Sequence, residues 1–357
     1  MENSKRDRAV KFGLEFIYQT ACNPEHFSVY GSDFLSCFYW ISATSSDPEL
    51  RALARSLGIE RAREWRREHT AAPPSAGPDD ITDLVFGNDA AQRLGVYNSD
   101  LKPQLRKLAA SYSANDYFFF DPTVEPPSGD VPLECSCGAA NSRGAKLCGQ
   151  CRRRLVMMSA YWVWLNAITI AYAGERHGTR LGASLSSVLK WRPVMSPYPK
   201  ARPLIPGGDS YWAIYAVTHL IYALNSYSLH RLSPDWLPAE VRFLKESINC
   251  VIAAGDPETL GEILDALKSF GYSEKDPLIE KGLRYLLSSQ NADGSWGDPE
   301  AKDIYERYHS TWTAIDGLRE YAWPGKRLSF QNLRSLLPTK APVSVAAKPV
   351  RNHAGRD

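Results

Sequence analysis

Four cysteines lie close together in the segment ECSCGAANSRGAKLCGQC. Cys135 and Cys137 form one close pair, Cys148 and Cys151 form another, and ten residues separate the two pairs. Four thiolates arranged in this way match a closed, tetrahedral zinc site. Such a site has no open coordination position, so the expected role of the zinc is structural. An odd, clustered cysteine count also favours metal binding over a disulfide framework.

Two histidines and two glutamates are the other residues whose types suit chemistry. His219, Glu262 and His309, with Glu258 one helical turn from Glu262, lie in apolar helical segments where a polar side chain needs a polar partner. Two imidazoles and a carboxylate suit Fe(II), Zn²⁺ or another divalent metal such as Mg²⁺. Without a metal, the same groups can act as a general acid and a general base. The alternative is that each histidine is a core residue that bonds to a neighbouring carboxylate or hydroxyl.

Aromatic side chains accompany these groups and are expected to shape a substrate pocket. The candidates are Tyr211, Trp212, Tyr215, Tyr308 and Trp312. Asp209, which follows Pro-Gly-Gly, is either a further pocket residue or only a helix N-cap. Packing of bulky side chains in the core is the alternative explanation for many of the rings.

A register shared by three segments places the polar residues on one face. Segments 215–227, 256–272 and 308–321 each contain a leucine near the end, followed shortly by an aromatic residue; these leucines are Leu224, Leu267 and Leu318. Five positions before the leucines stand His219, Glu262 and Thr313, and nine positions before them stand Tyr215, Glu258 and His309. Offsets of five and nine differ by about one helical turn, so both sets point the same way. We therefore expect His219, Glu262 and His309 to converge.

Carried upstream, this layout predicts an all-α fold of six helical hairpins, with few strand signals anywhere. The first helices are expected at residues 32–44, 79–94, 159–174, 208–227, 256–271 and 305–322. The second helices are expected at residues 47–69, 100–112, 178–192, 237–252, 276–289 and 328–337, unless a helix at 5–22 closes the last gap. Six hairpins with apolar first helices predict an (α/α)6 toroid around a central cavity.

The predicted domain organisation is simple. Residues 1–337 form a single toroid domain, and residues 131–156 form the zinc-ribbon-like element inserted into it. Residues 338–357 are rich in Ala and Pro and weakly basic, so a disordered tail is expected.

The segment KGLRYLLSSQNADGSW, residues 281–296, resembles the QW repeat of the squalene and terpene cyclase superfamily, which includes the β subunits of protein prenyltransferases. In that repeat the glutamine, here Gln290, caps the following inner helix, and the tryptophan, here Trp296, stacks on it. The resemblance implies an (α/α)6 toroid over about residues 150–325, and more loosely over the rest. It also implies a cavity in which aromatic rings line the site of chemistry.

The functional motifs of those families are only partly present. The acidic DxDD motif of squalene-type cyclases is missing. The string DDITD at residues 79–83 matches the DDxxD pattern by which class I terpene synthases hold Mg²⁺ and diphosphate, but its position predicts helix capping. The string YHST at residues 308–311 resembles the zinc-binding Tyr-His-Thr of prenyltransferases, whereas DSY at 209–211 lacks the cysteine of their Asp-x-Cys.

The leading hypothesis is an enzyme that resembles terpene cyclases and prenyltransferases and acts on a small, largely apolar substrate. His219, Glu262, His309 and Glu258 would then bind a metal or perform acid–base work. One alternative is an oxidoreductase of the non-heme iron type, with two histidines and one glutamate as ligands. The other is a non-catalytic binding or scaffold protein that kept the toroid and lost its chemistry.

Composition limits the partners. The 357 residues carry 42 Lys+Arg against 40 Asp+Glu, a net charge of +2, which excludes a general electrostatic hold on nucleic acid. The sequence has neither an apolar run long enough for a spanning helix nor a secretion signal, so we expect a cytoplasmic protein. The cysteine segment resembles small zinc ribbons and nucleoporin-type zinc fingers, and it ends in three arginines, 152–154. A protein partner at this element is one interpretation, and nucleic-acid binding is not expected.

Overall fold

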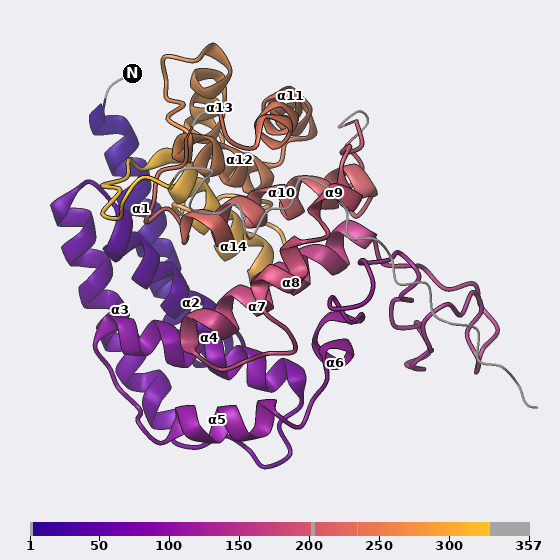
Figure 1. Ribbon diagram of the computed structural model, residues 1–357. Helices are drawn as coiled ribbons and strands as arrows, with labels where there is room; N and C mark the ends of the chain where they lie inside the picture. The colour runs from indigo at the N-terminus through magenta and orange to yellow at the C-terminus, as the bar shows by residue number, and fades with distance from the viewer. Residues whose placement is uncertain (1–2, 201–203, 234, 329–357) are drawn as a thin grey trace, which may run out of the picture.

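The structure, a computed structural model, describes residues 3–200, 204–233 and 235–328 and is all-helical over them. No β-strand occurs in these residues, so the all-α prediction is confirmed. The helices are α1 (Asn3–Ala21), α2 (Pro24–Thr44), α3 (Pro48–Glu68), α4 (Pro78–Leu94), α5 (Leu101–Ala109), α6 (Ala114–Phe118), α7 (Ala160–His177), α8 (Leu185–Leu189), α9 (Arg192–Met195), α10 (Asp209–Asn225), α11 (Pro238–Ala254), α12 (Pro257–Ser269), α13 (Pro277–Ser288) and α14 (Ile304–Leu318) (Figure 1).

Several helices begin with the same local signal. In α2, α3, α12 and α13 an Asn or Asp cap is followed directly by proline, and the cap side chain accepts a hydrogen bond from a backbone N–H of the first turn. Proline lacks the N–H that would be unpaired at this position, and its fixed φ suits the first helical turn. The DDITD string opens α4, where the Asp80 carboxylate accepts the backbone N–H of Gly77 at 2.9 Å. The predicted capping role of this string is therefore confirmed for Asp80.

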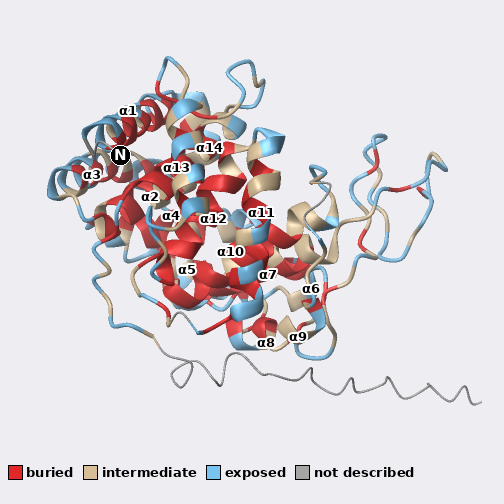
Figure 2. Ribbon diagram, turned by 90° about the horizontal axis from the view of Figure 1, so that it is seen from above, coloured by how far each residue is buried: buried red, intermediate tan, exposed pale blue. Residues whose placement is uncertain are grey.

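Six helices contact one another in sequence order: α2 with α4, then α7, α10, α12 and α14, after which α14 contacts α2 again. The other long helices pack outside them. Helix α3 lies on α2 and α4, α11 and α13 lie on α12, and α1 lies on α14 and α2. Buried residues concentrate in the middle of this helical body (Figure 2).

The six predicted first helices correspond to these six helices, and most of the predicted second helices are also present. The prediction of one helix over 178–192 is wrong. Gly178 and Gly182 adopt positive φ values of 77° and 65°, which interrupt the chain before the short helices α8 and α9. The predicted helix at 328–337 and the tail 338–357 lie, apart from Leu328, outside the described residues.

The QW-like segment joins three helices, but not in the way its family pattern predicts. The Gln290 side chain donates to the carbonyl oxygens of Ala9 in α1 and of Gly294, and the N-cap of α14 is Asp303. Capping of the next helix by Gln290 is therefore wrong. Trp296 makes the connection instead, because its indole N–H donates to the Leu286 carbonyl of α13 and its backbone N–H donates to the Thr311 hydroxyl of α14.

Helices α12 and α14 approach most closely where two glycines face each other. A Cβ atom at Gly261 would clash with the Thr313 carbonyl group, and one at Gly317 would lie 2.9 Å from the Gly261 Cα. The missing side chains therefore allow the two backbones to touch. This contact sets the distance between the helices that carry Glu262 and His309.

We expect Gly261→Ala to lower the free energy of unfolding by about 3 kcal/mol, because a methyl group against backbone atoms must push the helices apart. Denaturant unfolding followed by circular dichroism measures the change. Gly149→Ala is the matched control, since no atom lies within 4 Å of its added Cβ and its φ is not positive. Equal stability of the two variants would contradict the close approach.

Candidate active site and cysteine cluster

A cavity of about 300 Å³ lies where the six helices meet. Each of the six contributes side chains. The lining consists of Asp33, Ser36 and Trp40 of α2; Phe86 and Asp89 of α4; Thr169, Tyr172, Ala173 and Arg176 of α7; His219 and Tyr222 of α10; Tyr227; Glu262 and Asp265 of α12; and Tyr305, His309, Trp312, Thr313 and Asp316 of α14. Aromatic rings and carboxylates thus share one chamber with two imidazoles.

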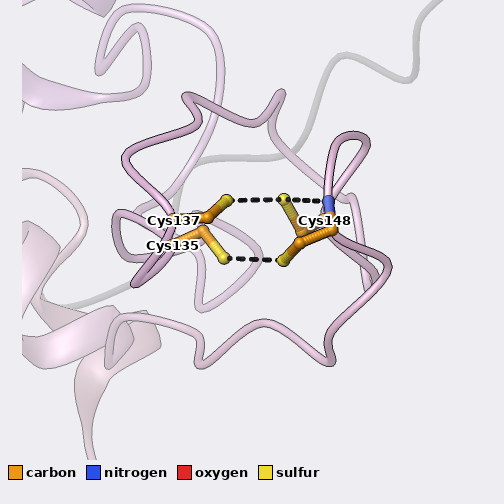
Figure 3. A group of neighbouring side chains, drawn as sticks. Cys135, Cys137 and Cys148 are labelled. Carbon is orange, nitrogen blue, oxygen red and sulfur yellow. Dashed lines mark hydrogen bonds between the residues drawn. The ribbon is translucent and has the colours of Figure 1, made fainter.

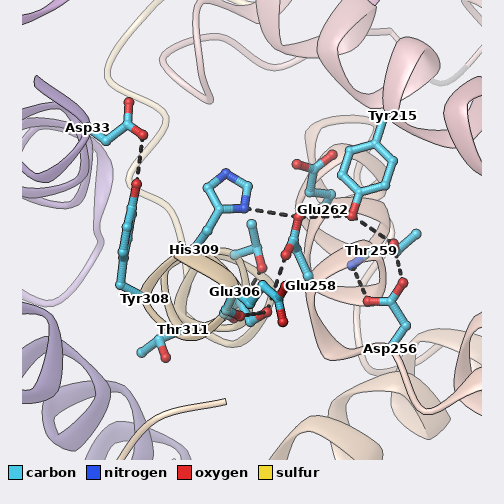
Figure 4. A network of polar contacts seen from close by, with 12 residues as sticks. Asp33, Tyr215, Asp256, Glu258, Thr259, Glu262, Glu306, Tyr308, His309 and Thr311 are labelled. Carbon is cyan, nitrogen blue, oxygen red and sulfur yellow. Dashed lines mark hydrogen bonds and ion pairs between the residues drawn. The ribbon is translucent and has the colours of Figure 1, made fainter. Parts of the chain in front are cut away.

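His309 is held by a carboxylate on the neighbouring helix. Its Nδ1 lies 3.0 Å from Glu258 Oε1, and the same carboxylate accepts hydrogen bonds from the hydroxyl groups of Tyr215 at 2.9 Å and Ser310 at 3.2 Å (Figure 4). Burial works against a charged imidazole, but Glu258, Glu262 and Asp33 raise the pKa of His309 to about 9. His309 is therefore an imidazolium at neutral pH, and its Nε2–H is a charged donor.

His219 has the opposite environment. Its Nδ1 donates to the backbone carbonyl of Tyr215 at 3.0 Å, which leaves Nε2 with the lone pair. Burial, reinforced by the charge of His309, lowers the pKa of His219 to about 4. His219 is therefore neutral at pH 7 and can accept a proton or a hydrogen bond.

Glu262 is buried beside both histidines, with 3% of its surface exposed. Its Oε2 accepts the Thr218 hydroxyl at 2.5 Å and lies 3.6 Å from His219 Nδ1. Burial raises the pKa of Glu262 to about 8, and the nearby Glu258 adds to the shift. The carboxyl group is thus mostly protonated at neutral pH.

Two acidic groups of the lining are tied to arginines. Asp89 forms ion pairs with Arg176 at 2.5 Å and with Arg93 at 3.0 Å. The Arg176 guanidinium also lies 4.1 Å from the centre of the Trp40 ring. Asp316 pairs with Arg319 at 2.6 Å. These two carboxylates therefore have positively charged partners close by.

A strained turn at the end of α10 presents Tyr227 to the cavity. Ser226, Tyr227 and Ser228 have φ values of 53°, 50° and 65°, so three consecutive non-glycine residues are left-handed. Such backbone costs roughly 1–2 kcal/mol per residue and persists only where packing compensates it. The Tyr227 ring stacks on Trp40 with ring centres 5.0 Å apart and also contacts Tyr222. The turn thus places the Tyr227 ring beside those of Trp40 and Tyr222 in the cavity lining.

The residues predicted for the cavity fall into three groups. His219, Glu262, His309 and Trp312 line it. Glu258, Tyr215 and Tyr308 are not part of the lining: Glu258 contacts His309, the Tyr215 hydroxyl donates to Glu258, and the Tyr308 hydroxyl donates to Asp33 at 2.9 Å. The others lie elsewhere, since Tyr211 lines a second cavity of about 440 Å³ that also reaches Glu258, Trp212 packs against Trp162, and Asp209 accepts the Ser159 hydroxyl.

Sequence reasoning missed a third level of the cavity. Two positions before the leucines of the shared register stand Tyr222, Asp265 and Asp316, and all three line the cavity. Offsets of two, five and nine share one helical face, so one more turn of the same register would have found them. Asp33, Asp89 and Arg176 lie on the earlier helices, where no such leucine register marks the inner face.

The metal-ligand prediction for the cavity depends on how close the side chains come. Among the described residues, only the four cysteines bring three or more ligand atoms within 4.8 Å of one another. His219 pairs with Glu262, whereas His309 pairs with Glu258. The three predicted ligands therefore do not form one group.

The cysteines Cys135, Cys137, Cys148 and Cys151 do form one group, in the segment that extends away from the helical body (Figures 1 and 3). The Cys135 and Cys151 sulfurs are 3.5 Å apart, those of Cys137 and Cys148 are 3.6 Å apart, and none is in a disulfide. Backbone N–H groups of Cys151 and Gln150 lower the pKa of the Cys148 thiol to about 6. The cluster is therefore suited to bind a metal ion such as zinc.

No known protein-family model matches this chain, and no curated protein is significantly similar to it in sequence. Among the described helices, none has both the length and the apolar composition that crossing a membrane requires.

Proposed function

We propose that this protein is an enzyme that performs acid–base catalysis on a small molecule in the six-helix cavity. The observation that carries the proposal is the pair of histidines with opposite partners: His309 faces a carboxylate through Nδ1, and His219 faces a backbone carbonyl. Titratable groups whose environments push their pKa values apart are the usual sign of an assigned acid and base.

In the proposed mechanism His309 is the general acid. Glu258 holds its Nδ1 and stabilises the imidazolium, so Nε2–H can donate a proton to a bound molecule. His219 is the general base, because its Nδ1–H is committed to the Tyr215 carbonyl and its Nε2 lone pair stays available. Glu262, beside His219, is placed to position the substrate.

We propose that the fold resembles that of the terpene cyclase and prenyltransferase class. We infer that the six helices in sequential contact form an (α/α)6 toroid, with α3, α11, α13 and α1 outside. Aromatic rings in the lining suit a substrate with an apolar body, as expected for that class. Because carboxylates and imidazoles share the same lining, the substrate must also carry a polar or charged group.

An oxidoreductase that binds metal through His219, Glu262 and His309 is less favoured by this geometry. A shared metal needs the lone pairs of both imidazoles, whereas His309 is a cation paired with Glu258. A non-catalytic scaffold is also less favoured, because the strained Tyr227 turn and the buried Glu262 both carry a cost in stability.

We also propose that the cysteine cluster binds one zinc ion with a structural role. Four sulfur ligands leave no open position for a substrate. The thiols remain reduced in the cytoplasm, where we place the protein. The projecting element and its arginines are then available to a protein partner, and the balanced net charge does not favour nucleic acid.

The proposed function is tested by incubating the purified protein with a metabolite extract and measuring which compounds are consumed. We expect wild-type protein to convert a compound that His309→Gln and His219→Gln leave unchanged, with melting temperatures within a few degrees of wild type. His230→Gln is the matched control, since that histidine bonds to the Lys326 carbonyl outside the cavity and should retain activity. Equal turnover by folded His309→Gln protein would contradict the proposal.

A further inference from the structure

Three acidic side chains in the cavity have no Arg or Lys partner among the described residues. Within the described residues, no Arg or Lys lies within ion-pair distance of Asp33, Glu262 or Asp265, in contrast to Asp89 and Asp316. All three carboxylates face the same chamber. The cations of the lining already have partners, since Arg176 is bound to Asp89 and the His309 imidazolium is paired with Glu258.

Each of these carboxylates receives a hydrogen bond from one hydroxyl group. Tyr308 donates to Asp33 at 2.9 Å, Thr218 donates to Glu262 at 2.5 Å, and Ser228 donates to Asp265 at 2.9 Å. Glu262 and Asp265 are only 3% and 4% exposed, so they have lost most of their hydration. Burial raises the pKa of all three groups, to about 8 for Glu262 and about 7 for Asp265, so a positive charge brought beside them would favour their ionised forms.

Aromatic rings share the chamber with these carboxylates. Tyr222, Tyr305 and Trp312 line it from α10 and α14, and the indole Nε1 of Trp312 is buried with no hydrogen-bond partner in the described residues. The negative face of an aromatic ring attracts a cation within about 6 Å. The same effect occurs within the lining, where the Arg176 guanidinium lies over the Trp40 ring.

The spacing of the carboxylates distinguishes between kinds of cation. Asp33, Glu262 and Asp265 do not form a group of ligand atoms within 4.8 Å of one another, as a metal ion requires. A cavity of about 300 Å³ is also far larger than a metal site and falls at the lower end of the range for small-molecule pockets. The charge to be bound is therefore spread over a larger, organic group.

We propose that the cavity binds a small organic cation, an alkylammonium group, in the chamber that Asp33, Glu262 and Asp265 share with the rings of Trp312 and Tyr222. This inference rests on the proposed function and names the ligand class of the same site. The ammonium charge favours the ionised forms of these carboxyl groups and pairs with them, while its alkyl groups contact the rings. His309 and His219 then lie beside the bound molecule for proton transfer.

The test compares choline with dimethylbutanol, its uncharged isostere, by isothermal titration calorimetry and thermal shift at pH 7.5. We expect choline to bind and raise the melting temperature, and the isostere to bind about tenfold more weakly or not at all, as one cation–π and ion-pair contribution implies. We expect Mg²⁺ alone to produce no shift. Equal affinity for the two isosteres, no binding of either, or stabilisation by Mg²⁺ alone would overturn the proposal.

Variants locate the site. Asp33→Asn and Trp312→Leu are expected to weaken choline binding about tenfold, and Glu300→Gln, a change at an exposed carboxylate outside the cavity, is expected to leave it unchanged. His309→Gln removes a positive charge from the cavity, so it should retain or strengthen choline binding. The same variant should no longer convert the compound that wild-type protein consumes from the metabolite extract. If choline binds but no compound of the metabolite extract is converted in a histidine-dependent way, only the proposed catalysis is contradicted. Unchanged choline binding in Asp33→Asn and Trp312→Leu would overturn the cation site alone.

Discussion

Glu258→Gln is expected to lower the pKa of His309 from about 9 to below the ordinary histidine value near 6.5, a fall of more than about 2 pH units. The amide keeps the size of the side chain but removes the nearest negative charge. Burial then acts against the imidazolium, and only Glu262 and Asp33 still favour it. Titration of the histidine ring carbons by NMR measures the shift.

The same substitution has a defined effect on stability. The raised pKa of His309 gives stability that is complete below about pH 6.5 and is lost as the pH rises through about 9. The lowered pKa of Glu258 gives stability that is lost as the pH falls through it. Wild type and Glu258→Gln should therefore differ most between about pH 5 and 6.5, and converge above pH 9.

Glu306→Gln is the matched control for this variant. Glu306 is an exposed carboxylate on α14, less than one turn before His309, with no ion pair to that histidine. We expect the pKa of His309 to stay within a few tenths of its wild-type value in this control. An unchanged pKa of His309 in Glu258→Gln would show that Glu258 does not stabilise the imidazolium.

The second large effect concerns the cysteine cluster. Wild-type protein is expected to contain one zinc per chain, and Cys135→Ser and Cys148→Ser should contain none, because each removes one of four sulfur ligands. Structural zinc contributes roughly 10–16 kcal/mol of binding free energy, so the projecting element should become sensitive to protease without it. Metal analysis and limited proteolysis measure the two effects. Circular dichroism of the helical body should change little.

Cys22→Ser is the control, since that exposed cysteine lies outside the cluster and should leave the zinc content at one. The double variant His219→Ala/His309→Ala should also keep one zinc. A second metal in wild-type protein that this double variant loses would contradict the acid–base account and restore the metal-dependent oxidoreductase.

The helices were largely predictable, because their signals are local. Proline after an Asn or Asp cap marks the start of several helices, and the leucine register orients the last three inner helices. That register led to His219, Glu262 and His309 because apolar helices rarely carry such residues without a polar neighbour. Its extension to Asp265 and Asp316 was overlooked, although the same periodicity contains them.

The rest of the site depends on contacts between distant segments. Nothing in the sequence near Asp33 indicates that Tyr308, far along the chain, donates to it. The left-handed turn at Tyr227 contains no glycine, the residue from which such a turn would be predicted. Likewise, Gln290 bonds to α1 because that helix lies against the loop after α13, where a Cβ atom at Gly294 would lie 2.7 Å from the Phe12 carbonyl oxygen. This tertiary contact overrides the role expected from the repeat.

The most direct test of the acid–base assignment is an NMR pH titration of the wild-type histidine rings, with signals assigned by His219→Gln and His309→Gln. The account predicts that His309 titrates near pH 9 and His219 near pH 4, so that one is charged and the other neutral at pH 7. Titration of both rings together near pH 6.5 would contradict it, because the cavity would then hold no distinct acid and base.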